Sequence, residues 1–208
     1  GSAFSHWDGR EFYSELMTPV ISDFVRYSRV TLALFEDSGW YLPDYSTAGP
    51  FHFGADKGCA FVDNDCVSGG VSSFPDTFCT SEDVRLCSSN TAGGVAGCTH
   101  DLLGRALCVM CRHAAPLPSH FQHFTDPTLG GDRLYMGYCP IWSPYVGTPF
   151  CRDEQARDHT VWGESFGEAS RCVMSNVVKT GYIPVSTPSG SCHAVRCEGS
   201  EVRIRVGE

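Results

Sequence analysis

The first residues that could carry metal chemistry are a histidine and a methionine near the start of the chain. His6 is followed eleven positions later by Met17, within the run Glu15-Leu16-Met17-Thr18-Pro19. A neutral imidazole binds metal ions through a ring nitrogen, and a methionine before a Thr-Pro turn can form a soft, apolar floor beneath such a site. His6 also fits an ordinary surface or hydrogen-bonded histidine, so these residues alone leave both interpretations open.

A histidine followed by such a "Met-turn" closes the zinc-protease pattern HExxHxxGxxH…Met of the metzincins. The segments Ser5-His6-Trp7 and Ser14–Pro19 resemble leishmanolysin, the major surface zinc protease family of kinetoplastid parasites. The resemblance continues in the same order through most of the chain. The further blocks that carry it are Leu32–Tyr41 (LALFEDSGWY), Gly58–Phe61 (GCAF), Phe124–Gly130 (FTDPTLG), Tyr138–Pro140 (YCP) and Ala169–Cys172 (ASRC).

The resemblance implies a role for each residue of the first segment. His6 corresponds to the third zinc ligand and Met17 to the methionine of the Met-turn, while Thr18, Pro19 and Val20 would help to form the wall of the substrate-specificity pocket. In the family, zinc held by three histidines activates a water, and the HExxH glutamate takes its proton. HExxH is absent from this chain, so no catalytic residue is expected here.

The implied protein is a zinc metalloendopeptidase of which this chain is the C-terminal portion. One zinc ion is expected, with two further histidine ligands from the missing N-terminal catalytic half of the same protein. That half and the protein or peptide substrates are the expected partners. The chain alone is predicted to be inactive, because one histidine cannot fix a catalytic zinc.

The expected fold is α+β. Apolar residues recur near helical spacing from Val20 to Ser38, and Gly39 follows as a residue that ends helices. The resemblance implies that this helix packs beneath the zinc site. Residues 40–58 are predicted to form loops. Near the C-terminus, Val202, Ile204 and Val206 alternate with charged residues, which predicts a half-exposed closing strand.

A shift in composition toward Ser, Gly, Cys and Pro places a predicted domain boundary after Cys66. Residues 1–66 are expected to be the end of a metzincin-type catalytic unit, with the Met-turn and the following helix. Residues 67–208 are expected to form a disulfide-rich C-terminal domain made mainly of short strands and loops.

The chain contains twelve cysteines, an even number that suits an oxidising compartment. An alternative interpretation is a second zinc site, because Cys108-x-x-Cys111 is followed by His120-x-x-His123. The resemblance favours disulfides instead, since the family carries aromatic residues at both histidine positions. The interval from Cys98 to Cys108 matches a family cysteine pair, which leaves Cys111 and a cysteine near Cys87 as an added pair. We therefore predict that most or all cysteines are disulfide-bonded, including Cys108 and Cys111.

Composition narrows the remaining function classes. A formal net charge of −9, with only 15 Lys and Arg, argues against nucleic acid or an anionic membrane surface as a partner. The sequence contains no stretch long enough to span a bilayer, no signal peptide and no tail that directs a GPI anchor. We expect a cell-surface or secreted protein whose ends have been removed, with a GPI anchor as one form of attachment for the longer protein.

The remaining titratable residues show no defined chemical pattern. The spacing of the other histidines does not call for metal, and the carboxylates form no recognisable acid/base pair; these residues are His52, His100, His113, His159, His193, Glu11, Glu15, Asp153 and Glu154. Two rival functions stay open. One is a non-catalytic, cysteine-rich binding or cell-adhesion module, and the other is a family pseudoenzyme whose missing part lacks HExxH.

Overall fold

The computed structural model describes residues 5–20, 25–81, 84–88, 95–144, 149–156, 163–178 and 188–206. Its helical elements are α1 (Gly9–Phe12), α2 (Arg29–Asp37), η1 (Tyr45–Thr47), α3 (Ala60–Asp63), η2 (Ser119–Phe121) and η3 (Leu134–Met136). Its strands are β1 (Val67–Ser68), β2 (Val71–Ser72), β3 (Arg85–Leu86), β4 (Ala96–Cys98), β5 (Arg105–Cys108), β6 (Cys111–Arg112), β7 (Leu129–Gly130), β8 (Trp142–Pro144), β9 (Ser170–Ser175), β10 (Ser189–Glu198) and β11 (Glu201–Arg205). The predicted mixture of few helices, short strands and many loops is confirmed.

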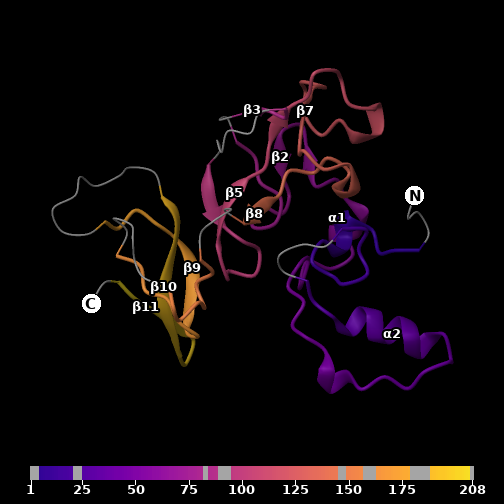
Figure 1. Cartoon of the computed structure of the whole chain (residues 1–208). Helices are drawn as coiled ribbons and strands as arrows, with labels where there is room; N and C mark the ends of the chain where they lie inside the picture. Colours follow the sequence, from indigo (N-terminus) through magenta and orange to yellow (C-terminus); the bar gives the residue numbers. More distant parts are fainter. Residues whose placement is uncertain are drawn as a thin grey trace.

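The strands form small separate sheets rather than one continuous layer. Their orders are β1-β2, β3-β6-β7, β4-β5-β8 and β11-β10-β9. In Figure 1, α1 and α2 lie on the right and the β9–β11 sheet lies on the left, with β5 and β8 between them and β2, β3 and β7 at the top. Among the described residues, the helices are all too short to cross a lipid bilayer.

The β9–β11 sheet is built around β10, which pairs antiparallel with both β9 and β11. Gly190 of β10 lies so close to β4 that a Cβ atom there would sit 1.9 Å from the carbonyl oxygen of Gly97. A disulfide between Cys98 and Cys172 also joins β4 to β9. The predicted closing strand is confirmed as β11, although Val202, Ile204 and Val206 remain 64, 46 and 45 % exposed.

The predicted helix after Pro19 begins later than the apolar pattern indicates. Within the described residues, Arg26 pairs with the turn before it: its N–H donates to Ser14 O (2.6 Å), and Leu16 N–H donates to Arg26 O (2.8 Å). This non-local pairing holds the chain extended until Ser28, whose hydroxyl caps α2 by accepting from Val30 N–H (3.1 Å). The predicted end is confirmed, because Gly39 has φ +71°. Residues 21–24 lie outside the described residues.

The main core is aromatic and draws on both sides of the predicted boundary at Cys66. It surrounds the buried Cys66–Cys139 disulfide, and its largest members are Tyr13, Phe53, Phe61, Phe74, Phe78, Met136 and Ile141. Phe53 meets Phe61 and Phe78 edge-on, with ring centroids 5.6 and 6.0 Å apart. The division at residue 66 stays a prediction.

Ten of the twelve cysteines form disulfides, which confirms that most are bonded. The pairs are Cys66–Cys139, Cys79–Cys108, Cys87–Cys111, Cys98–Cys172 and Cys151–Cys192. The expected added pair is therefore Cys87–Cys111. Cys98 and Cys108 are not bonded to each other but to partners on other segments. Cys59 and Cys197 are free and exposed.

Candidate functional site

The segment that carries His6 and Met17 folds back on itself around α1. Asp8 caps this short helix by accepting a hydrogen bond from Arg10 N–H (2.8 Å). The returning chain then brings Met17 beside the residue after His6, and Trp7 N–H donates to Met17 O (2.8 Å). The structure thus places the backbone of Met17 beside Trp7, the residue that follows His6.

Met17 lies in a hydrogen-bonded turn. Thr18 N–H donates to Glu15 O (3.2 Å), and the Thr18 hydroxyl donates to the same oxygen (2.9 Å), which closes the turn twice. The side chain of Met17 is 37 % exposed and that of Val20 is 42 % exposed, whereas Thr18 is buried and Pro19 is half-buried. The apolar side chains of the turn are therefore partly open to one surface.

Glu15 is the most buried charged residue of this segment, with 1 % exposure. Its carboxylate accepts hydrogen bonds from Ser28 N–H (3.1 Å) and from the Thr31 hydroxyl. Thr31 in turn accepts from the indole Nε1–H of Trp7 (2.9 Å). A buried carboxylate is costly unless it is hydrogen-bonded, and these donors on α2 and its cap satisfy it.

His6 itself is exposed, and the Ser5 Oγ lies 2.9 Å from its Nδ1. An exposed imidazole is a chemically suitable zinc ligand, but a zinc site needs three or four protein ligands. Among the described residues, the groups of three ligand side chains close enough to share an ion do not include His6. In the part of the chain that the structure describes, His6 therefore offers a single donor of a suitable kind, and one donor cannot hold zinc by itself.

Two further carboxylates belong to α1, Asp8 as its N-cap and Glu11 in its first turn. Burial and the nearby Asp8 carboxylate raise the pKa of Glu11 to about 7. Arg10 lies 3.6 Å from Glu11 and partly offsets this effect. Glu11 is thus a group that titrates near neutral pH, unlike an ordinary surface glutamate.

The alternative zinc constellation at Cys108, Cys111, His120 and His123 is wrong. Cys108 is bonded to Cys79 and Cys111 to Cys87, so neither sulfur is a thiolate that could bind zinc. His120 is exposed, with its ring centroid 4.1 Å from that of Phe121. The ring thus meets an aromatic neighbour, and the predicted disulfides are confirmed.

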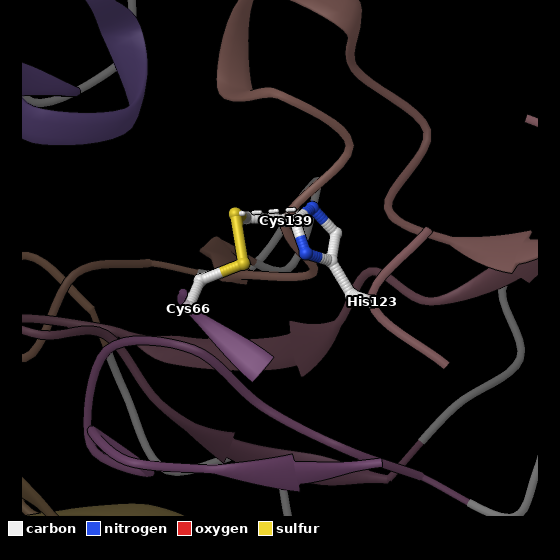
Figure 2. A group of neighbouring side chains, drawn as sticks. All are labelled: Cys66, His123 and Cys139. Atoms are coloured by element: carbon white, nitrogen blue, oxygen red, sulfur yellow. Dashed lines mark hydrogen bonds between the residues drawn. A yellow bond between two sulfur atoms is a disulfide. The ribbon is translucent and has the colours of Figure 1, made fainter. Parts of the chain in front are cut away.

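Two histidines lie against disulfides, in arrangements that superficially resemble metal sites. Figure 2 shows His123 beside the Cys66–Cys139 disulfide, with its Nε2 3.7 Å from Cys139 Sγ. The same nitrogen lies 2.8 Å from Gly137 O. Because a carbonyl oxygen only accepts, Nε2 carries the proton and cannot bind a metal. His113 repeats this arrangement beside Cys111, with Gly131 O 2.9 Å from its Nε2.

The other histidines occupy varied settings. His52 is exposed, whereas His193 is fully buried with its Nε2 2.9 Å from Ser191 Oγ. His100 lies edge-on to the rings of Tyr13 and Phe53, and burial lowers its pKa to about 4. His159 is outside the described residues.

Sequence reasoning missed the network of Glu15, Thr31 and Trp7. Glu15 had the appearance of one carboxylate among many, and Thr31 lies sixteen residues away on a helix. No spacing rule joins a turn residue to a helix across that distance. The only signal in the sequence was Thr31, a polar residue between Val30 and Leu32 on the apolar part of the predicted helix. That signal indicates a buried hydroxyl but does not identify its partner.

Comparison with known proteins places the whole chain in one family. A family model described as leishmanolysin matches residues 1–208. The chain is 33 % identical to leishmanolysin of Leishmania donovani over 201 residues, which cover 95 % of this chain and 32 % of that protein. It is 32 % identical over 205 residues to a leishmanolysin homolog of Crithidia fasciculata, covering 97 % of this chain and 30 % of that protein. A leishmanolysin-like peptidase of Drosophila melanogaster is 31 % identical over 199 residues, which cover 83 % of this chain and 28 % of the relative. The chain thus spans about a third of the length of these relatives.

Proposed function

The chain belongs to the leishmanolysin family of peptidases, and from this membership we propose that it is the C-terminal portion of a zinc metalloendopeptidase. The observation that carries the proposal is the hydrogen bond from Trp7 N–H to Met17 O, which brings the histidine segment and the turn together. His6 would be the third zinc ligand, and Met17 would lie beneath the metal. The N-terminal half of the same protein would supply two histidines and the HExxH glutamate.

Each residue of the segment has a distinct task in this proposal. In such sites zinc supplies Lewis-acid activation of water for attack on a peptide carbonyl. His6 binds the ion through its imidazole, and Met17 offers shape and polarisability rather than a bond. Thr18 fixes the turn through its two hydrogen bonds to Glu15 O, which lets Pro19 and Val20 face the substrate as part of the pocket wall.

The substrates, the partner and the location of the protein follow from the same proposal. The substrates are proteins or peptides, and the partner of this chain is the N-terminal catalytic half. Five disulfides suit a cell-surface or secreted protein, because such bonds persist in oxidising compartments. The isolated chain should show no peptidase activity, since it lacks two ligands and the general base.

The decisive experiment uses the protease that contains both this chain and its N-terminal half. His6→Ala should abolish peptidase activity and lower the zinc content measured by metal analysis, because a three-histidine site loses one ligand. Met17→Leu should keep zinc, since such swaps usually cost less than about 1.5 kcal/mol of stability. His52→Ala is the matched control, because His52 is also an exposed histidine but is not one of the predicted zinc ligands. Normal zinc content and turnover in His6→Ala would contradict the proposal.

A second candidate, a non-catalytic binding or adhesion module, is favoured by a different feature. Trp40, Tyr41 and Leu42 are 83, 60 and 97 % exposed. Tyr41 and Leu42 line a cleft of about 430 Å³ beside α2, together with Tyr27, Leu32 and Phe35. Large exposed apolar side chains beside a cleft are typical of binding surfaces. Absence of HExxH from the N-terminal half would favour this function over catalysis.

A further inference from the structure

We propose that Glu15 is a positioning residue for the zinc ligand His6, and that it acts through Thr31 and Trp7. The inference rests on the proposed function, because it assumes that His6 binds zinc. It adds a specific claim: the buried carboxylate on the turn sets the position of the residue next to the ligand.

The direction of the hydrogen bonds in this network is fixed by chemistry. The indole nitrogen of Trp7 can only donate, so the Thr31 oxygen, 2.9 Å away, must accept. Thr31 then has one hydroxyl hydrogen left, and Glu15 Oε1 receives it. The other carboxylate oxygen, Oε2, accepts from Ser28 N–H (3.1 Å), so both oxygens of Glu15 act as acceptors. The order Trp7 to Thr31 to Glu15 is therefore unambiguous.

Burial makes this arrangement stiff. Glu15, Thr31 and Ser28 are each 1 % exposed, so water does not compete for their hydrogen bonds. The capping of α2 does not require Glu15, because the Ser28 hydroxyl already accepts from Val30 N–H (3.1 Å). What the carboxylate adds is the fixed orientation of Thr31, and through it the fixed orientation of the Trp7 indole.

Trp7 is consequently held from several sides. Its backbone N–H donates to Met17 O (2.8 Å), its indole donates to Thr31, and its ring packs against Phe12 with centroids 5.0 Å apart. His6 is the adjacent residue and its own side chain is exposed. Fixing Trp7 therefore fixes the backbone on the C-terminal side of His6. Metal sites depend on such supporting contacts, whose loss typically weakens metal binding about 10–100-fold.

The test begins with the network itself in the 208-residue chain. Thr31→Val removes both hydroxyl bonds at nearly constant volume, and Thr31→Ser restores the hydroxyl. Trp7→Phe removes only the indole donor and leaves the carboxylate satisfied, so it is the variant least disruptive to folding. Amide and indole NMR should show the Trp7 indole N–H exchanging faster in Thr31→Val and Glu15→Gln, and returning to the wild-type rate in Thr31→Ser.

The functional arm uses the protease that contains both halves, with zinc affinity measured by competition with a chelator. Thr31→Val, Glu15→Gln and Trp7→Phe should each weaken zinc binding about tenfold or more, and Thr31→Ser should restore it. Ile141→Val, in the core near Cys139, is the control for general destabilisation. It should lower the melting temperature without changing zinc affinity.

The outcomes separate the two proposals. If His6→Ala retains zinc, the proposed function fails and the inference fails with it. If His6→Ala loses zinc while Thr31→Val, Glu15→Gln and Trp7→Phe all bind it as tightly as Ile141→Val does, only the positioning role is wrong. Weakened zinc binding that Thr31→Ser rescues supports the inference, because loss of stability alone would not follow the hydroxyl.

Discussion

The segment that carries His6 and the part of the chain after residue 58 are stabilised by different kinds of interaction. The first cysteine is Cys59, so residues 5–20 and 25–58 contain no disulfide. They are held by a buried carboxylate, a closed turn and aromatic packing. The later part is held by five disulfides around small sheets.

Contacts between the two regions join them at a defined surface. Arg10 donates to Phe61 O (2.5 Å) and Asn64 O (2.6 Å), and its guanidinium lies 5.1 Å from the centre of the Phe78 ring. From the other side, Arg133 donates to the hydroxyl of Tyr13 (3.3 Å). The comparison shows that disulfides stabilise the later region, which we call the disulfide-linked base. The candidate site is instead stabilised by a buried hydrogen-bond network, and its segment packs against that base.

The largest effect on stability should come from the disulfide nearest this surface. Cys66–Cys139 closes 73 residues and Cys87–Cys111 closes 24, and loop length alone favours the longer one by about 1 kcal/mol. Removing either typically costs about 2–5 kcal/mol. Both Cys66 and Cys139 are buried, whereas Cys87 is only half-buried. Urea unfolding of Cys66→Ala/Cys139→Ala should therefore show the greater loss.

The outcome tests whether the disulfide-linked base supports the candidate site. If the two double variants lose equal stability, the aromatic core does not depend on its central disulfide. If Cys66→Ala/Cys139→Ala also speeds exchange of the Trp7 indole N–H, the network at the turn depends on the base. Cys87→Ala/Cys111→Ala should leave that exchange unchanged.

A smaller effect is expected where α1 meets η3. A Cβ atom at Gly9 would lie 2.5 Å from Tyr135 O and 2.7 Å from the Tyr135 ring, so Gly9→Ala must push the two elements apart. Overpacking of this kind typically costs about 1–3 kcal/mol. Gly49→Ala is the matched control, because its Cβ would have only ordinary contacts, the nearest at 3.6 Å. Chemical denaturation should show a clear loss for Gly9→Ala and almost none for Gly49→Ala; equal losses would show that α1 is not tightly docked.

Much of the later region could be predicted from the sequence, because its constraints are compositional. An excess of cysteine predicts disulfides, and the alternation of apolar with charged residues predicts β11. The pairing of cysteines could not be predicted, since partners such as Cys98 and Cys172 are 74 residues apart and only the fold brings them together.

The first region was harder to predict because non-local hydrogen bonds override its local pattern. The apolar spacing from Val20 to Ser38 is helical, yet the pairing of Arg26 with Ser14 and Leu16 keeps residues 25–28 out of the helix. The burial of Glu15 depends on the same fold-back, which brings α2 beside the turn. The resemblance to a family identified His6 and Met17, whereas the residues that hold them in place are visible only in three dimensions.

The smallest expected effect is on pH dependence, and it distinguishes two groups near the surface that joins the regions. His100 has an ordinary pKa of 6.5, lowered to about 4 in the fold by burial. The unfolded chain therefore binds more protons between these values, and stability rises as pH increases from about 4 to 6.5. Glu11 has an ordinary pKa of 4.5, raised to about 7 by burial and by Asp8. Here the folded chain binds more protons, so stability falls as pH increases from about 4.5 to 7.

These opposite slopes overlap and partly cancel in the wild-type protein, so single substitutions should reveal them. His100→Gln should leave the negative slope of Glu11, and urea unfolding between pH 4.5 and 6.5 should show stability falling with pH more steeply than in wild type. Glu11→Gln should leave the positive slope of His100 over the same range. Because each substitution also changes packing, the readout is the change of slope with pH and not the stability at one pH. Parallel curves for wild type and His100→Gln would mean that His100 is solvated, and that the loop after β4 does not seal the aromatic core against Tyr13 and Phe53.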